Sequence, residues 1–381
     1  MRRRNVARML CLFIGVCLAA DGGRAEDIKE ATAMAMKLRN MPEILKGVKR
    51  ILFYGDSLTD GSDYPDYVVN TLNRAFPDAG FEILNSAVCG NTAADLRKRM
   101  QADVIDRKPD LVSICIGVND CIGKRPVADY EADMEALATA IQKAGARVLL
   151  MLPSNLGDPE REARFLEYLA VIRKVAAAHN ALVADAHAEF LKGTKEGREM
   201  LGADGVHHGK NGFEGMARAV LDALGFQDVP VDKEIKPWPH MLTQWESSEP
   251  IPNKPPFDPA KATGWKPYDR EAAVAKQPWW NAPFAARGGW MPFALAKPPD
   301  GSIAFGRTRY QATRAGKAEL QVGGSPPQVV WLNGRQVWQG QGSHGYHPNA
   351  DRFMVDLQAG PNEIVVLSNY MAFVGLREVG E

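Results

Sequence analysis

The sequence predicts an α/β protein in which a doubly wound parallel sheet is followed by a small β-sandwich. Up to Gly225, short and continuously apolar runs alternate with amphipathic helical stretches. This alternation is typical of a parallel sheet that is covered by helices on both faces. Tryptophan and proline then become dense, and from about residue 287 alternating strands follow one another with turns between them.

The apolar runs of the first half are each short enough to be one buried strand. The expected strands are residues 50–54, 81–88, 111–116, 148–152 and 181–184. The expected helices include residues 93–106, 127–144, 160–179 and 212–224. The apolar residues of the last helix share one stripe, which predicts the face that packs on the sheet.

The second half is divided by its composition. All 8 tryptophans follow Pro237, and more than half of the 25 prolines lie between residues 230 and 299. Because proline opposes regular helices and central strands, residues 229–286 are predicted to be an extended connector. Residues 287–381 are predicted to form the β-sandwich, in which Asn333-Gly334 marks a two-residue hairpin turn. Its expected strands are residues 303–312, 318–322, 329–338, 353–357 and 363–367.

Four short motifs occur in one order at the ends of expected strands or before an expected helix. They are Gly55-Asp56-Ser57-Leu58, Gly90, Gly117-Val118-Asn119-Asp120 and Asp204-Gly205-Val206-His207. A serine, hydrogen-bond donors for an oxyanion, and a histidine with an orienting carboxylate are the groups that acyl transfer requires. Ligands of doubly wound sheets bind at the carboxyl ends of the strands, so we expect these groups to meet there.

This set of residues resembles the SGNH hydrolases, also called GDSL esterases, over residues 49–225. The resemblance implies a flavodoxin-like sheet and a serine esterase activity. It implies that Ser57 is the nucleophile, with His207 as its base and Asp204 as the orienting carboxylate. The oxyanion hole would consist of the backbone N–H groups of Ser57 and Gly90 and the side-chain amide of Asn119. The catalytic domain is placed at residues 26–228.

Several alternatives remain open at this stage. His207 can accept the serine proton if Asp204 holds its other ring nitrogen as a donor, but the adjacent His208 is a second candidate base. Asp204 is alternatively a helix N-cap, Ser57 a capping serine, and Asn119-Asp120 a plain turn. Three further acids are interpreted as turn and capping residues: Asp56, Asp60 and Asp120.

The net charge and the N-terminal sequence indicate which kinds of partner and which cellular location to expect. The 46 basic and 46 acidic residues balance, so there is no electrostatic case for binding nucleic acid. Arg2-Arg3-Arg4, an apolar stretch from Met9 to Ala20 and the small residues after it predict an export signal over residues 1–25. Cleavage would follow Ala25 or Ala20. The alternative is an uncleaved anchor, but the apolar stretch is short for a membrane span. We therefore expect a secreted or periplasmic protein without stable membrane insertion.

The cysteines and histidines do not indicate a metal or a cofactor. Cys89, Cys115 and Cys121 remain after signal cleavage, so at least one stays free unless it pairs between molecules. We expect Cys89 and Cys115 to be buried thiols. His344 and His347 are interpreted as solvated residues. No metal-ligand spacing and no phosphate-binding glycine loop occur, so neither a cofactor nor a metal is predicted.

Residues 287–381 also resemble, more weakly, the galactose-binding-like jelly rolls that are appended to secreted carbohydrate enzymes. The matching features are the Leu332-Asn333-Gly334 hairpin and the turn from Leu357 to Glu363. In this region Trp331, Trp338 and Tyr346 either stack on sugar rings or fill the core.

These observations together predict an exported esterase that removes small acyl groups, acetyl above all, from a carbohydrate. Its substrate would be a polysaccharide or small-molecule acyl ester. One alternative is a lysophospholipase or thioesterase that acts on lipid-like acyl esters. The other is a non-catalytic carbohydrate-binding surface protein with a degenerate hydrolase fold. The oligomeric state is not predicted.

Overall fold

The computed structural model describes residues 41–276, 283–291, 302–324, 328–340, 346–369 and 371–379. The expected export signal lies outside these residues. The chain divides into two compact units. The first comprises the residues up to Phe53 together with Tyr64–Ile83 and Thr92–Glu234, and the second comprises Tyr54–Asp63, Leu84–Asn91 and the residues from Ile235 onward.

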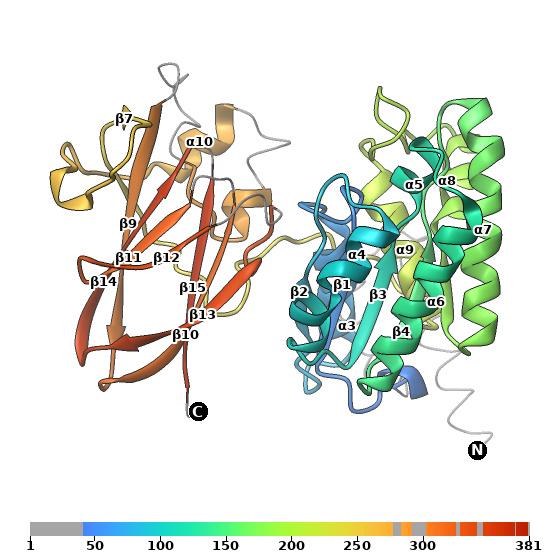
Figure 1. Ribbon diagram of the computed structural model, residues 1–381, viewed down its shortest axis with the longest axis horizontal. Coiled ribbons are helices and arrows are strands. Elements are labelled where there is room, and N and C mark those ends of the chain that lie inside the picture. Colours follow the sequence, from blue (N-terminus) through green and yellow to red (C-terminus); the bar gives the residue numbers. More distant parts are fainter. Residues whose placement is uncertain are drawn as a thin grey trace, which may run out of the picture. The chain divides into compact units, whose positions relative to one another are not determined.

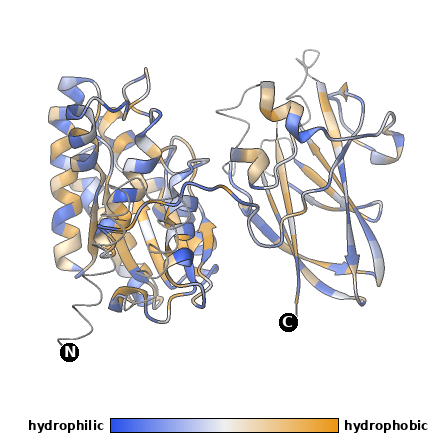
Figure 2. Cartoon of the chain, turned by 180° about the vertical axis from the view of Figure 1, so that it is seen from behind, coloured by the Kyte–Doolittle hydropathy of each residue, from blue (hydrophilic) through white to orange (hydrophobic). Residues whose placement is uncertain are grey.

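Within the described residues, five strands form one sheet in the order β2-β1-β3-β4-β5 (Figure 1). Their bounds are β1 (Arg50–Gly55), β2 (Glu82–Asn85), β3 (Leu111–Cys115), β4 (Arg147–Leu152) and β5 (Leu182–Asp185). The strands are parallel, with Val112 opposite Val148 and Leu149 opposite Leu182. Most of their side chains are buried, and Figure 2 colours the strands as mainly hydrophobic. This order is that of flavodoxin-like sheets, so the predicted fold class is confirmed.

The helices form two layers that cover the two faces of this sheet. α4, α6 and α7 pack side by side in one layer, and α3, α9 and α8 in the other (Figure 1). As predicted, α9 buries an apolar stripe that includes Met216, Val220 and Leu221. No helix in the described ranges is both long and apolar enough to cross a membrane. The helical bounds are η1 (Glu43–Leu45), α3 (Tyr64–Ala75), α4 (Ala93–Met100), the π-helical turn η2 (Gln101–Ile105), α5 (Val118–Ile122), α6 (Val127–Lys143), α7 (Pro159–Ala178), α8 (Ala186–Lys195) and α9 (Gly212–Ala223).

The second unit contains antiparallel sheets that are consistent with the predicted small β-sandwich. One has the order β13-β10-β15, and the other β12-β11-β14-β9-β6-β8, with β7 beside β9. Asn333 and Gly334, with φ of 51° and 78°, form the turn between β11 and β12 that the sequence predicts. The jelly-roll resemblance is not confirmed. The bounds are β9 (Ser302–Ala312), β10 (Gly316–Gly324), β11 (Val329–Leu332), β12 (Arg335–Gln339), β13 (Asp351–Leu357), β14 (Gly360–Ser368) and β15 (Ala372–Glu378).

The segment predicted to be an extended connector contributes three strands of two residues at one side of the larger of these sheets. β6 (Glu246–Ser247) and β7 (Ile251–Pro252) both pair with β9, and β8 (Lys266–Pro267) pairs with β6. Strands of two residues at a sheet edge tolerate proline because few ladder hydrogen bonds are required there. The segment also includes η3 (Pro259–Lys261) and α10 (Arg270–Lys276). Its Trp245 stacks on Trp290 in the core of the unit, with ring centroids 5.8 Å apart.

The aromatic residues that were considered for sugar stacking lie within hydrophobic clusters. Trp331 is 4% exposed and meets the Phe305 ring edge-on at 5.6 Å. Trp338 stacks on Phe353 at 5.8 Å with an interplanar angle of 4°. Tyr346 packs against a cluster that contains Phe284, Met371 and Phe373. The structure therefore favours the core-filling alternative.

Within the second unit, the segments Tyr54–Asp63 and Leu84–Asn91 are hydrogen-bonded to residues that come after Ile235 in the chain. The N–H of Tyr346 donates to Asp60 Oδ1 at 2.5 Å, and Arg287 donates to Asp63 Oδ1 at 2.8 Å. His347 is buried, with Nε2 3.3 Å from the Ala87 carbonyl, so its interpretation as a solvated residue is wrong. His344 lies outside the described residues. The domain limits 26–228, 229–286 and 287–381 remain predictions.

Candidate active site

Ser57 lies in a tight turn at the carboxyl end of β1. The buried Asp56 stabilises this turn: its Oδ1 accepts a hydrogen bond from Leu58 N at 3.0 Å, and its carbonyl accepts one from Thr59 N. Ser57 is partly exposed between the buried Asp56 and Leu58. Because α3 begins only at Tyr64, Ser57 is not the N-cap of that helix.

Gly90 follows β2 in an exposed loop and has φ of 78°, a left-handed conformation that favours glycine. The residue before it, Cys89, donates from both N and Sγ to Asp60 Oδ2, at 3.2 and 3.1 Å. Asp60 therefore connects the turn that contains Ser57 with the loop that contains Gly90. The local sequence carries no signal for this connection, because Asp60 and Cys89 are far apart along the chain.

The three cysteines among the described residues are free thiols. Cys115 is buried, as expected, and so is Cys121. Cys89 is exposed, so the expectation that it is buried is wrong. It lies in the loop after β2 rather than in the strand itself.

Asn119 lies in the first turn of α5, directly after β3. Gly117 precedes it with φ of 123°, and a Cβ at this position would come within 2.8 Å of Tyr130 Oη, so only glycine fits. Asn119 is partly exposed, whereas its neighbours Val118 and Asp120 are buried. Asn119 therefore lies in a short helix and is not part of a plain turn.

These three candidates follow neighbouring strands of one sheet. β1 lies between β2 and β3, and Ser57, Gly90 and Asn119 come after the carboxyl ends of β1, β2 and β3 (Figure 1). In a sheet of this order, the boundary between β1 and β3 is the topological switch point, where ligands of doubly wound proteins bind. The order of the motifs along the chain therefore agrees with the order of the strands in the sheet.

Asp204 and His207 form a hydrogen-bonded pair in the loop before α9. His207 Nδ1 lies 2.6 Å from Asp204 Oδ2, and Asp204 Oδ1 accepts the backbone N–H groups of Val206 and His207 at 3.0 and 2.9 Å. The side chains of both members of the pair are 52% exposed. The helix begins only at Gly212, so Asp204 is not its N-cap.

The hydrogen bonds of Asp204 determine which ring nitrogen of His207 can act as a base. The hydrogen bond from the His207 side chain, followed by that from Val206 N, lowers the pKa of Asp204 to about 2, so the carboxylate is ionised at neutral pH. An ionised carboxylate can only accept, so Nδ1 must carry a proton. In the neutral imidazole Nε2 is then an acceptor, which is the state that a general base requires.

The loop that carries this pair is connected to two other segments of the first unit. Gly202 N donates to the carbonyl of His207 at 2.8 Å, and Gly157 N donates to the carbonyl of Gly205 at 2.7 Å. A Cβ on Gly157 would lie 2.9 Å from the Gly205 Cα, so the two backbones approach as closely as glycine allows. These contacts hold the Asp-Gly-Val-His loop against the loop that follows β4.

His208 is in a different environment from its neighbour. Its ring packs against Phe190 and Phe213, with centroids 5.7 and 5.2 Å away, and its Nε2 is buried without a hydrogen-bond partner in the described residues. Burial lowers the pKa of His208 to about 3. His208 is therefore an apolar packing residue, and the choice between the two histidines favours His207.

We expect the free energy of unfolding of His208→Phe to decrease less in acid than that of the parent protein. Below pH 6.5 the unfolded chain binds a proton at His208 that the folded chain does not bind until about pH 3. The free energy of unfolding therefore falls as the pH decreases through this window, by up to about 1.4 kcal/mol per pH unit. Urea unfolding at pH 7 and pH 5 measures the difference. An equal decrease in the parent and in the variant would contradict the burial of a neutral His208.

Comparison with known proteins extends this picture beyond the individual motifs. A family model for the GDSL-like lipase/acylhydrolase family matches residues 53–214. An acetylxylan esterase of Geobacillus stearothermophilus is 32% identical over 209 residues, which are 47% of this chain and 95% of that protein. The esterase TesA of Pseudomonas aeruginosa is 32% identical over 164 residues, which are 41% of this chain and 78% of that protein. A crystal structure of an acetylxylan esterase from Geobacillus stearothermophilus is 30% identical, covers 48% of this chain and 96% of its own, and has a TM-score of 0.44.

The matched segment contains all the candidate residues: Ser57, Gly90, Asn119, Asp204 and His207. Because this chain covers nearly the whole length of a relative that is 32% identical to it, the assignment does not depend on short motifs alone. The chain belongs to the GDSL-like lipase/acylhydrolase (SGNH) family and is a carboxylic ester hydrolase.

Proposed function

We propose that this enzyme is an exported serine esterase that removes small acyl groups, above all acetyl, from a carbohydrate. The observation that carries the proposal is the Asp204–His207 pair, in which an ionised carboxylate holds Nδ1 as the donor. A histidine held in this tautomer can take the proton of a serine hydroxyl through Nε2. The acetyl and carbohydrate parts are supported by the acetylxylan esterase that is similar to the chain over 95% of that esterase's length.

In the proposed reaction, Ser57 Oγ attacks the carbonyl carbon of the ester while His207 Nε2 accepts the hydroxyl proton. The negative charge on the carbonyl oxygen is stabilised by the N–H groups of Ser57 and Gly90 and by the side-chain amide of Asn119. The tetrahedral intermediate then breaks its bond to the sugar oxygen, which takes the proton from His207 and leaves as a hydroxyl, while the acyl group remains on Ser57 Oγ. Water, activated by the same histidine, then releases the acid and regenerates Ser57.

A chain-length series combined with a natural substrate tests this proposal. We expect kcat/KM for p-nitrophenyl esters to be highest for acetate and to fall steadily towards octanoate. Acetylated xylan should release acetate, and the Ser57→Ala variant, as the matched control, should release none. Rates that rise with acyl length would instead support a lysophospholipase or thioesterase. Hydrolysis of the aryl acetate without acetate release from any acetylated polysaccharide would contradict the carbohydrate part.

Asn119→Ala should lower turnover without weakening substrate binding. If the amide stabilises the oxyanion, its loss should reduce kcat by roughly 10²–10³-fold, or about 2.7–4 kcal/mol of transition-state stabilisation. KM should change little, because the charge on the oxygen develops only in the transition state. Steady-state kinetics on p-nitrophenyl acetate measures both parameters. A large increase in KM at unchanged kcat would make Asn119 a substrate-binding residue instead.

We propose that residues 1–25 direct the chain across a membrane and are then removed. The support is the arginine cluster followed by an apolar stretch and small residues. Expression of the full chain and mass spectrometry of the exported product should give a mature N-terminus at Glu26 or at Asp21. A protein that retains Met1 at the cell surface would support the uncleaved anchor.

A further inference from the structure

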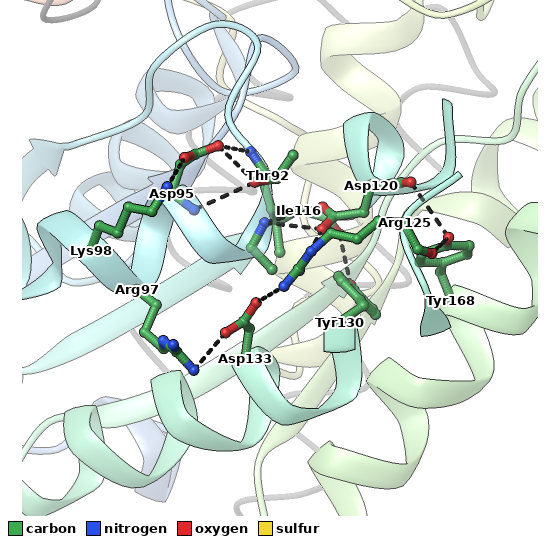
Figure 3. A network of polar contacts seen from close by, with 11 residues as sticks. Thr92, Asp95, Arg97, Lys98, Ile116, Asp120, Arg125, Tyr130, Asp133 and Tyr168 are labelled. Carbon is green, nitrogen blue, oxygen red and sulfur yellow. Dashed lines mark hydrogen bonds and ion pairs between the residues drawn. The ribbon is translucent and has the colours of Figure 1, made fainter. Parts of the chain in front are cut away.

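The residue after the proposed oxyanion donor Asn119 is a fully buried carboxylate. Asp120 is 0% exposed, and its two oxygens lie 3.3 and 3.1 Å from the backbone N of Ala93, the first residue of α4 (Figure 3). Ala93 is also buried, and the residue before it, Thr92, caps the same helix. One carboxylate on α5 therefore binds the start of a second helix.

Arg125 neutralises this carboxylate and extends the contacts to α6. Arg125 Nη1 donates to Asp120 Oδ1 at 3.0 Å, and Nη2 donates to Asp133 Oδ2 (Figure 3). Asp133 Oδ1 in turn accepts Arg97 Nη1 of α4 at 2.8 Å. The hydroxyl of Tyr168 donates to the Arg125 carbonyl. The network thus connects α4, α5, α6 and α7 through Asp120, the residue that follows Asn119 in the chain.

Burying an ionised carboxylate costs free energy, which is unfavourable if Asp120 only stabilises the fold. Burial raises the pKa of Asp120, whereas the hydrogen bonds from Arg125 and Ala93 act in the opposite direction. A buried ion pair often contributes little net stability compared with apolar residues of similar volume, but it fixes geometry strongly. The geometry fixed here joins the turn that carries Asn119 to the helix that follows Gly90 by three residues along the chain.

We propose that Asp120 is a positioning residue for the oxyanion hole. By binding Ala93 N and Arg125 together, it sets the position of the first turn of α5 relative to the first turn of α4. It thereby holds the Asn119 amide at the spacing that the developing oxyanion requires. This inference rests on the proposed role of Asn119, through which Asp120 acts.

The test is a double-mutant cycle between Asp120 and Asn119. Turnover of p-nitrophenyl acetate is measured per active site, with the sites counted as the folded chains that elute in the native peak on gel filtration, so unfolded protein does not affect the result. Asp120→Asn keeps the shape of the side chain and removes its charge. We expect it to lower kcat about 10–100-fold with KM within about threefold, because displacements near 1 Å have effects of this size. In the Asn119→Ala background the same change should cost less than about threefold, since the residue it positions is gone.

Two further variants separate positioning from general stabilisation. Ala93→Pro removes the N–H that Asp120 accepts, at a first helical position where proline is favoured. It should lower kcat by a smaller factor than the one expected for Asp120→Asn. This result can be obtained even if Asp120→Asn does not fold. Asp133→Asn, the matched control, removes an ion pair of the same arginine but does not contact Ala93, and it should leave kcat per site within about twofold.

Additive losses in the cycle, or wild-type kcat per site in both Asp120→Asn and Ala93→Pro, would overturn the inference. Wild-type kcat in Asn119→Ala would overturn the oxyanion assignment and this inference with it. A large loss in Asn119→Ala without any loss in Asp120→Asn would overturn this inference alone.

Discussion

Ser57→Ala should fold like the parent enzyme and lose nearly all esterase activity. Without Oγ no acyl-enzyme can form, and loss of a serine nucleophile elsewhere costs on the order of 10⁶-fold in kcat. The rate on p-nitrophenyl acetate should therefore fall to a level that only the remaining oxyanion donors sustain. Thermal unfolding should remain close to that of the parent, because the side chain is partly exposed and the turn is held by Asp56.

Ser62→Ala is the matched control for this experiment. It deletes the same hydroxyl five residues later, where the side chain is buried and its Oγ has no hydrogen-bond partner among the described residues. Its activity should equal that of the parent. An active Ser57→Ala variant would remove the nucleophile from the proposed mechanism.

His207→Ala should be nearly as damaging as Ser57→Ala. The serine and its base act as a unit, so removing either one costs almost as much as removing both. The Asp204–His207 pair has the geometry of a base with its orienting carboxylate, and the loss should appear in kcat rather than in KM. Steady-state kinetics on p-nitrophenyl acetate provides the measurement.

The neighbouring histidine provides the internal control. His208→Phe should retain most of the activity, because His208 packs between two phenylalanine rings and its low pKa makes it a weak base near neutral pH. A greater loss in His208→Phe than in His207→Ala would reverse the assignment of the base.

The order of the secondary structure was predictable because continuous apolar runs and helical stripes are local signals. The hairpin at Asn333-Gly334 was predictable for the same reason, since its turn type depends on those two residues. The two-residue strands β6, β7 and β8 were not predictable. Strands of two residues show no alternation, and the prolines of β7 and β8 argue against a strand until the neighbouring strands are present as partners.

The sequence predicted which residues form the candidate site, but it did not predict their surroundings. The sequence left His207 and His208 as alternatives because adjacent histidines differ only in their surroundings. Burial of the His208 ring nitrogen Nε2 and the hydrogen bond from His207 to Asp204 distinguish them in the structure. Asp120 was expected to be a turn or capping residue, and it does accept a helix N-terminal N–H, but on a different helix. That contact spans 27 residues and has no local signal.

Covalent labelling with a serine-directed aryl phosphonate tests the central claim most directly. The reagent reacts with a serine only where a base removes its proton and an oxyanion hole accepts its oxygen. We predict one phosphonyl group per chain, located on Ser57 by peptide mass spectrometry, with labelling strongly slowed in His207→Ala and unchanged in rate in His208→Phe. A label on another residue, or no label on an enzyme that hydrolyses aryl acetate, would contradict the account.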